Sequence, residues 1–364
     1  MAHARSLRDL DWPLITIALV ISSLGVLQIY SATLDTKWEN AWWKQTLYIL
    51  IGLIIMYGAT RMDYHTLLGR VPIMYLVGIV LMIATLFVGT RIFGSRRWIP
   101  LFGGFHFQVS EFFKLVIVLL VARYLSERKT QHLETSDLVK LTILVGIPLA
   151  LVVAQPDLGT SLTYFPILGV GMFLGGMRWQ HLVAILTVGA VLLPIGWYFF
   201  LKDYQRARIE TFLDPAKDPR GRGYQVIQSR IAVGAGGPWG KGVTHGSQTQ
   251  LRFLPVPHTD FIVSAFAEEH GFVGIVVLLG LYFLLLMQIV QNGQMAPDRA
   301  GMYICMGIAA CLLFHLLVNA GMAVGRMPVT GIPLPFMSAG GSNMLSVFLM
   351  LGLVNNVRLR RFVA

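Results

Sequence analysis

Charge is scarce in this chain: 13% of its 364 residues are Asp, Glu, Lys or Arg, whereas 55% are hydrophobic. A soluble domain carries about 25% charged residues, and folding buries no more than about 75% of the surface of a chain of this size. So much apolar surface could not be hidden from water. The composition excludes a soluble enzyme, a disordered chain and a fibrous chain, and it predicts a protein that crosses a membrane several times.

Cysteine and acidic residues are also few. The two cysteines, Cys305 and Cys311, lie in one apolar run at a spacing that fits no metal or redox motif, so we expect buried thiols. The 29 Lys and Arg exceed the 18 Asp and Glu and give a net charge of +11. Nucleic acid is a common partner of a basic chain, but these basic residues are scattered between apolar runs. We therefore expect no nucleic-acid partner.

The apolar residues gather into runs of about the length that crosses a bilayer, which is about 20 residues. The first run follows Arg5 and Arg8 and is too long for a signal-peptide core, so it predicts an uncleaved anchor. The chain has no internal repeat. We predict an all-α polytopic membrane protein, a single domain over 1–364, with about ten transmembrane helices near 13–32, 45–60, 71–90, 110–125, 138–154, 160–177, 182–201, 271–290, 301–323 and 345–357.

The distribution of Lys and Arg orients these helices, because cytoplasmic loops are enriched in both. With a cytoplasmic N-terminus, thirteen fall in inner segments and six in short outer ones. Both termini are then cytoplasmic, and 202–258 forms a large extracytoplasmic loop with nine Lys or Arg against four acids. Its many Gly and Pro predict turns, with one short amphipathic helix near 224–232. The loop either binds an anionic group or is a solvated linker.

Several polar residues lie where a membrane helix should be apolar. Glu111 and Lys114 are three residues apart and share a helical face; they either hold helices together or line a polar cavity and orient a substrate. Arg96, Arg97 and Trp98 form either a cation–aromatic cluster near a site or an ordinary interfacial anchor.

Two further segments interrupt the helical pattern. Asp157 follows Pro156 with almost no loop between two apolar runs, so it either caps a helix or lies near the site. Residues 328–344 hold three prolines and three glycines among apolar residues and cannot form a regular helix. Irregular backbone at membrane depth must be buried or line a wet cavity. We predict a re-entrant, cavity-lining segment there, with a surface turn as the alternative.

The stretch from Asp260 to Gln291 is too long for one straight crossing, because it would span roughly 48 Å at 1.5 Å per residue. We divide it into an interfacial piece at 259–269 and a span at 271–290, which places Asp260, Glu268 and Glu269 at the outer surface. Asp260 follows His258 and Thr259. It is either a plain helix cap or, beside an anion-binding surface, a general base.

Several segments of the sequence match one known family. They are QVSEFFK at 108–114, QPDLGT at 155–160, DYQRARIETFLDP at 203–215, GRGYQVIQSRIAVGAGGPWGKG at 221–242, QTQLRFLP at 248–255, HTDFIVSAFAEEHGFVG at 258–274 and GIPLPFMSAGGS at 331–342. Together these segments resemble the SEDS family (shape, elongation, division and sporulation). Most of the chain carries the resemblance, which extends to the ten-helix pattern. GKG and TQLRFLP resemble the RodA branch more than the division paralogue FtsW. The family usually has other residues at Val109, Ala235, Val256 and Pro257, which affects loop shape.

The resemblance implies a peptidoglycan glycosyltransferase that polymerises lipid II for elongation and rod shape. It implies a multi-pass protein of the bacterial cytoplasmic membrane with its active site on the extracytoplasmic side. It also implies a class B penicillin-binding protein as the transpeptidase partner. The family's essential loop aspartate corresponds to Asp260, its buried acid–base pair to Glu111 and Lys114, and its QPD aspartate to Asp157.

The chemistry of that reaction assigns roles to the remaining residues. Asp260 is the expected base, because an ordinary Asp, with a pKa of about 3.9, is ionised near neutrality. Departure of the polyprenyl diphosphate needs positive charge, from Lys114, Arg96, Arg97, Arg206 or Arg208. The outer loop carries no complete metal cage, and Mg²⁺ or Mn²⁺ shared between Asp260 and the substrate stays an open alternative. The expected substrate-binding residues are Glu111, Lys114, Arg96, Arg97, Trp98, Asp157, Arg206, Arg208, His258, Thr259, Ser338 and Ser342.

Two other functions fit part of the pattern. A transporter that flips a lipid-linked precursor would also use many helices, a broken segment and embedded charges. However, the charges lie at one membrane face and no repeat is visible. A non-catalytic scaffold for a penicillin-binding protein would leave Asp260 unexplained.

Overall fold

The structure is a computed structural model that describes residues 9–92, 95–100, 106–128, 130, 132–200, 203–218 and 221–361. Arg5 and Arg8, which contributed to the predicted orientation, lie outside the described residues. Positions 202, 219 and 220 of the predicted outer loop also lie outside them.

Each apolar run of the sequence lies largely in helix. The runs at 71–90 and 160–177 extend a few residues past α3 and α7, and position 201 of the run at 182–201 lies outside the described residues. The run at 160–177 is divided at Thr163 into two helices. By length and composition, six helices among the described residues qualify as membrane spans: α1, α3, α5, α8 (continued to Phe199), α12 and α13. The helices that carry the apolar runs are α1 (Trp12–Thr33), α2 (Ala41–Arg61), α3 (Tyr64–Val88), α4 (Val109–Ser126), α5 (Thr135–Ala154), α6 (Leu158–Leu162), α7 (Tyr164–Leu174), α8 (Trp179–Ile195), α12 (Ile262–Gln294), α13 (Arg299–Ala323) and α14 (Gly341–Arg360).

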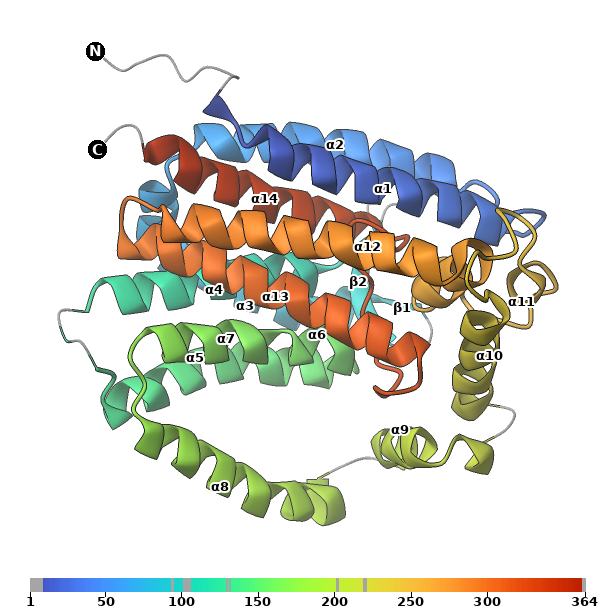
Figure 1. The fold of residues 1–364 in the computed structure, drawn as a ribbon. Helices are drawn as coiled ribbons and strands as arrows, with labels where there is room; N and C mark the ends of the chain where they lie inside the picture. Colours follow the sequence, from blue (N-terminus) through green and yellow to red (C-terminus); the bar gives the residue numbers. More distant parts are fainter. Residues whose placement is uncertain are drawn as a thin grey trace.

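The helices run roughly side by side (Figure 1). Most residues of α4, α13 and α14 are buried. Close contact between α2 and α14 depends on glycine, as is common where membrane helices pack. A Cβ on Gly52 of α2 would lie 2.6 Å from the ring of Phe348, and one on Gly352 of α14 would lie 2.7 Å from the carbonyl oxygen of Met56. By contrast, α8 lies apart from the other helices in Figure 1, and none of the residues described in it is buried.

The first and last helices are joined at one end of the bundle. Asp11 caps α1 by accepting a hydrogen bond from the backbone N–H of Leu14 at 3.2 Å. It also forms an ion pair with Arg358 at 2.9 Å, and its own N–H donates to Asn355. The start of α1 and the end of α14 therefore lie together, and α9, α10 and α11 lie at the opposite end (Figure 1).

A small antiparallel sheet between α3 and α4 is an exception to the all-α prediction. Its strands are β1 (Thr90–Ile92), β2 (Ser95–Pro100) and β3 (His106–Phe107), in the order β1-β2-β3. Trp98 pairs with Thr90, and Ile99 pairs with Phe107. The segment is rich in β-branched and aromatic residues, which favour strands, so the sheet brings Arg96, Arg97 and Trp98 to the start of α4.

The predicted outer loop is more helical than its glycines and prolines suggested. It contains α9 (Asp203–Leu213), the 3-10 turn η4 (Pro215–Lys217), α10 (Arg222–Ala235) and α11 (Ser247–Gln250). The expected short helix is α10, which is longer than 224–232 because it packs on the bundle: the hydroxyl of Ser229 lies 2.6 Å from that of Ser264 and donates to the Ala323 carbonyl. The prediction that turns dominate is therefore wrong before residue 236.

The long stretch after Asp260 bends where the sequence predicted a division. Gly271 lies inside α12 with φ 67° and ψ −166°, which kinks the helix. The two carboxylates just before the kink, Glu268 and Glu269, are buried, although we expected them at the outer surface. Glu268 accepts from the backbone N–H groups of Gln248 and Thr249 at 2.8 and 3.1 Å. This carboxylate therefore ties α11 to α12.

Candidate active site

A cavity of about 1270 Å³ opens at the end of the bundle that carries α10 and α11. Side chains from distant parts of the sequence line it, including the starts of α2, α4, α6 and α14, strands β2 and β3, and the segment before α12. The charged residues in its wall are Lys37, Lys44, Arg97, Glu111, Asp157, Arg252 and Asp260. The fold thus gathers acids and bases from seven separate positions around one polar space.

Glu111 and Lys114 form a buried ion pair at the start of α4. The Nζ of Lys114 lies 2.9 Å from Oε2 of Glu111, and the two residues are 1% and 3% exposed. Glu111 lines the cavity and lies in the first turn of α4, where the helix dipole favours a negative charge. Lys114 lies one turn later in α4, and its ammonium group donates to the carboxylate. The pair therefore presents its acid to the cavity and keeps its base within the protein.

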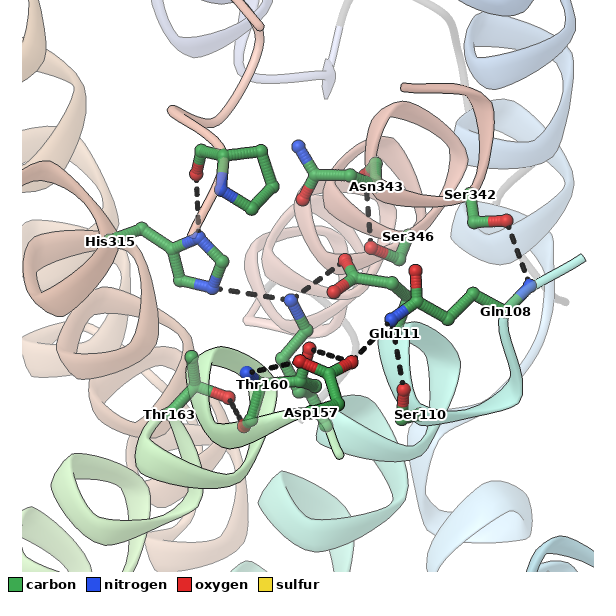
Figure 2. Close-up of polar contacts among 12 residues, drawn as sticks. Gln108, Ser110, Glu111, Asp157, Thr160, Thr163, His315, Ser342, Asn343 and Ser346 are labelled. Carbon is green, nitrogen blue, oxygen red and sulfur yellow. Dashed lines mark hydrogen bonds and ion pairs between the residues drawn. The ribbon is translucent and has the colours of Figure 1, made fainter. Parts of the chain in front are cut away.

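His315 of α13 extends this pair. Its Nδ1 lies 2.9 Å from the carbonyl oxygen of Pro333, and its Nε2 lies 3.2 Å from Nζ of Lys114 (Figure 2). A carbonyl oxygen can only accept, so Nδ1 carries the proton, and Nε2 of a neutral ring accepts from the lysine. Glu111, Lys114 and His315 thus form a continuous chain from the cavity wall to the irregular segment before α14.

Asp157 caps α6 and also organises the cavity wall. Its carboxylate accepts from the backbone N–H of Thr160 at 3.2 Å and forms an ion pair with Arg97 at 3.0 Å. The side-chain amide of Gln108 donates to it at 2.8 Å (Figure 2). Arg97 in turn lies over the ring of Trp98, 4.2 Å from its centroid. Both interpretations of Asp157 therefore have support, because the capping residue is itself part of the cavity.

Asp260 lies in a backbone segment that is held at three consecutive carbonyls. The carbonyl of His258 accepts from the Ala339 N–H at 2.9 Å, and that of Thr259 accepts from the Ser338 hydroxyl at 2.6 Å. The carbonyl of Asp260 accepts from the Asn319 side-chain amide at 3.1 Å. These bonds fix the peptide on which the Asp260 carboxylate is carried.

The irregular segment from Pro328 to Gly340 supplies most of those contacts, and it is not a surface turn. Ile332, Leu334, Phe336, Met337 and Ser338 are buried in it. Gly331, with φ 72°, lies so near the aspartate that a Cβ there would be 3.6 Å from Oδ2 of Asp260. The segment therefore forms the floor of the cavity beneath Asp260.

The ring of His258 lies near the indole of Trp38, with 5.9 Å between the ring centroids. Burial lowers the pKa of His258 to about 4, because the site disfavours the charged imidazolium. His258 is therefore neutral at pH 7 and contributes no positive charge to the cavity.

The predicted site residues thus fall into three groups. Arg97, Trp98, Glu111, Asp157, His258, Thr259, Asp260 and Ser342 line the cavity. Lys114 and Ser338 lie directly behind its wall, the hydroxyl of Ser338 accepting from Leu334 N–H as well as donating to Thr259. The others lie elsewhere: Arg96 donates to the Leu86 carbonyl at 3.5 Å, Arg206 donates to the Tyr198 carbonyl at 3.0 Å, and the side chain of Arg208 lies outside what the structure describes.

Sequence reasoning missed several residues of the site. Lys37 and Lys44, which line the cavity, were counted only among the Lys and Arg of the short outer segments. Arg252, which also lines it, was counted only among the nine Lys and Arg of the large outer loop. His315 and Asn343 carried at most a weak signal. His315 shares a largely apolar run with Asn319, and Asn343 directly follows Ser342 at the end of the irregular segment. Among the described residues no group of three or more His, Cys, Asp or Glu side chains could hold a metal ion.

The sequence of this chain matches a known protein family. Residues 11–361 match the family described as cell cycle protein, FtsW/RodA/SpoVE. The peptidoglycan glycosyltransferase MrdB of Escherichia coli is 39% identical over 86% of this chain and 84% of its own length. The peptidoglycan glycosyltransferase RodA of Treponema pallidum is 30% identical over 98% and 99%.

Solved structures agree with the sequence relatives. A chain from a study of the structural coordination of polymerization and crosslinking by a peptidoglycan synthase complex is 34% identical, with a TM-score of 0.85 over 98% of this chain and 99% of that one. The rod shape determining protein RodA of Thermus thermophilus is 29% identical, with a TM-score of 0.73 over 97% and 98%.

Proposed function

The chain belongs to the FtsW/RodA/SpoVE family, and from this membership we propose that it is a peptidoglycan glycosyltransferase that polymerises lipid II. The observation that carries the proposal is the cavity, whose lining includes Asp260, Glu111 and several cationic side chains. Relatives named MrdB and RodA are peptidoglycan glycosyltransferases, which supports the activity and favours a role in elongation and rod shape.

Asp260 is the proposed general base. The 4-hydroxyl of the acceptor GlcNAc gives its proton to the Asp260 carboxylate while its oxygen bonds to the anomeric carbon of the donor. The bond from that carbon to the diphosphate breaks on the opposite side, which inverts the configuration, and the electron pair leaves with the polyprenyl diphosphate. The three carbonyl contacts at His258, Thr259 and Asp260 support this role because they fix the base in place.

The cationic wall has a separate task. Negative charge grows on the diphosphate as it leaves, and fixed positive groups stabilise it most where water is excluded. Arg97 is oriented for this by its ion pair with Asp157. Lys37, Lys44 and Arg252 add further positive charge to the same cavity. A divalent cation shared between Asp260 and the substrate would supply the same stabilisation and belongs to the proposal only as an alternative.

We further propose ten crossings, both termini in the cytoplasm and the cavity on the extracytoplasmic side of the bacterial cytoplasmic membrane. The joined ends of α1 and α14, opposite α10 and α11, support an even number of crossings. The cytoplasmic excess of Lys and Arg supports the orientation. The segment 328–344 would then be re-entrant from the outer face.

The proposed partner is a class B penicillin-binding protein, which would crosslink the strands that this chain polymerises. The similar chain from a peptidoglycan synthase complex, in which polymerization and crosslinking are coordinated, supports this partner.

The test is polymerisation of labelled lipid II by the purified protein with its partner in detergent. Detergent removes the two compartments, so a flippase would give no product, whereas the proposed enzyme gives glycan strands. Loss of the strands in Asp260→Asn protein with an unchanged melting temperature would support the assigned base. Failure of the folded wild-type complex to form strands would refute the proposed activity.

A further inference from the structure

We propose that the first turn of α14, Gly341 to Asn343, together with Lys44, is the binding site for the diphosphate of the polyprenyl-linked substrate. This inference rests on the proposed function and assigns the part of the cavity that holds the leaving group. The same four residues line the cavity.

The start of α14 exposes backbone donors to the cavity. The first N–H groups of any helix have no acceptor within the helix, and here the N-cap is Gly340, which has no side chain to accept from them. The helix continues for 20 residues, and its dipole adds partial positive charge at this end. Backbone N–H groups at a helix N-terminus are well suited to phosphate oxygens.

Asn343 independently indicates a ligand. It is 4% exposed and lines the cavity, yet neither Oδ1 nor Nδ2 has a hydrogen-bond partner among the residues that the structure describes. A buried carboxamide without partners costs free energy, and this cost is removed if a bound molecule supplies them. In Figure 2 the only contact drawn to Asn343 comes from the hydroxyl of Ser346, and it reaches the backbone carbonyl of Asn343. The Nδ2 group can donate to a phosphate oxygen beside the helix N–H groups.

The surroundings hold this turn rigidly. Gln45 of α2 accepts from the Gly340 N–H at 3.2 Å and donates to the Ser338 carbonyl at 3.0 Å. The Ser342 hydroxyl accepts from Gln108 N–H and donates to the His106 carbonyl, each at 3.0 Å. The side chains of Gln45 and Ser342 are therefore committed to fixing the turn, while the carboxamide of Asn343, a residue of the cavity lining, is not used in this way.

Lys44 supplies the charge. It lies on α2 four residues before Tyr48, so the two share a helical face. Tyr48 packs against Gly341, where an added Cβ would lie 2.8 Å from the phenol ring. Lys44 therefore projects from the face of α2 that meets the start of α14. A diphosphate there would be held by one ammonium group, one carboxamide and the helix N-terminus.

The experiment measures binding and needs no turnover. Farnesyl diphosphate is titrated into the purified protein in detergent, and the shift in melting temperature reports binding. Farnesyl monophosphate, farnesol and inorganic diphosphate are the comparison probes. We expect farnesyl diphosphate to bind most tightly, inorganic diphosphate more weakly because it lacks the prenyl chain, and farnesol not to depend on the residues at the start of α14.

Three variants make the test specific. Asn343→Ala removes the amide donor and should weaken farnesyl diphosphate about tenfold. Asn343→Asp should weaken it further by repulsion. The helix dipole favours Asp at the third position of a helix, but the position is buried, so binding is compared at equal folded fraction. Gln225→Glu places the same carboxamide-to-carboxylate change on α10 in the same cavity, away from α14. It should change binding by less than about threefold.

The outcomes separate this inference from the proposed function. Farnesyl diphosphate binding that is unchanged in folded Asn343→Asp protein, or equally weakened by Gln225→Glu, would overturn the assignment, whatever the polymerisation activity. Diphosphate binding that follows the predicted order of variants would support the site even if no glycan strands form.

Discussion

Nζ of Lys114 lies 3.2 Å from Nε2 of His315 and 2.9 Å from Oε2 of Glu111, so one lysine links Glu111 in the cavity wall to the buried His315 of α13. On the far side of the ring, His315 donates to the Pro333 carbonyl. One turn later on α13, Asn319 donates to the carbonyls of both Ile332 and Asp260. The proposed base and the buried ion pair are therefore held by neighbouring residues of one helix.

Breaking the buried ion pair should cost both stability and activity. Glu111→Gln or Lys114→Met leaves the partner as an uncompensated buried charge, which typically costs about 3–5 kcal/mol. We expect a lower melting temperature and slower lipid II polymerisation in each single variant. The double variant, with no stranded charge, should recover much of the melting temperature and none of the activity. Wild-type turnover in both single variants would reduce the pair to an incidental contact.

His315 should act by positioning. His315→Leu leaves the Pro333 carbonyl and a proton of Lys114 without partners, and each buried loss costs about 1–3 kcal/mol. We expect kcat for polymerisation to fall while KM changes little, and His315→Gln to restore part of kcat because an amide both donates and accepts. Leu316→Ala, which removes a buried side chain from the next position of α13, is the packing control. An equal kcat loss in this control would contradict the positioning role.

Gly331 should be required for reasons beyond its backbone angle. Gly331→Ala and Gly325→Ala both place a Cβ at positive φ, 72° and 70°, which costs about 1–2 kcal/mol. Only the first of these Cβ atoms comes near Oδ2 of Asp260. A Cβ on Gly325 would also lie 3.0 Å from Cδ of Arg230. We therefore expect a melting temperature at least as low in Gly325→Ala but a larger loss of polymerisation in Gly331→Ala. Matched activities of the two variants, measured at equal folded fraction, would argue against an effect of the added methyl group on the neighbouring Asp260 carboxylate.

The buried His258 should make the folded state sensitive to acid. Its pKa falls from the ordinary value of 6.5 to about 4, so between these values the unfolded chain takes up a proton that the folded one does not. Stability from the neutral ring is therefore complete above about pH 6.5 and is lost as the pH falls toward 4. Melting temperatures measured across this range should fall in the wild type and fall less in His258→Asn. Parallel curves would contradict the assignment.

The helical fold was largely predictable because each apolar run is long and continuous, and such runs have few alternatives to a helix. The bend in α12 was also predictable, since Asp260–Gln291 exceeds the thickness of a bilayer. The three-stranded sheet was missed because its strands are short and depend on pairing. The burial of Glu268 and Glu269 was missed because their partners, such as Thr249 and Ser31, come from distant segments.

Charged residues within apolar sequence predicted much of the site, but the sequence does not show which groups surround each of them in the fold. Glu111, Asp157 and Asp260 stood out because acids are rare in this chain, and the fold brings all three to one cavity. Arg96 and Arg206 were selected from the sequence as positive charges for the diphosphate, yet their guanidinium groups donate to backbone carbonyls elsewhere. His315 is recognised as part of the site only from its contacts with Lys114 and Pro333, and Asn343 only from its buried carboxamide, which has no partner among the described residues.

The most direct test of the account is the polymerisation of labelled lipid II by Asp260→Asn protein with its partner in detergent. Replacement of the carboxylate by an amide keeps the shape of the side chain and removes the base. The account predicts no glycan strands from the variant, strands from the wild type, and equal melting temperatures for both. Wild-type strand formation by the variant would contradict it.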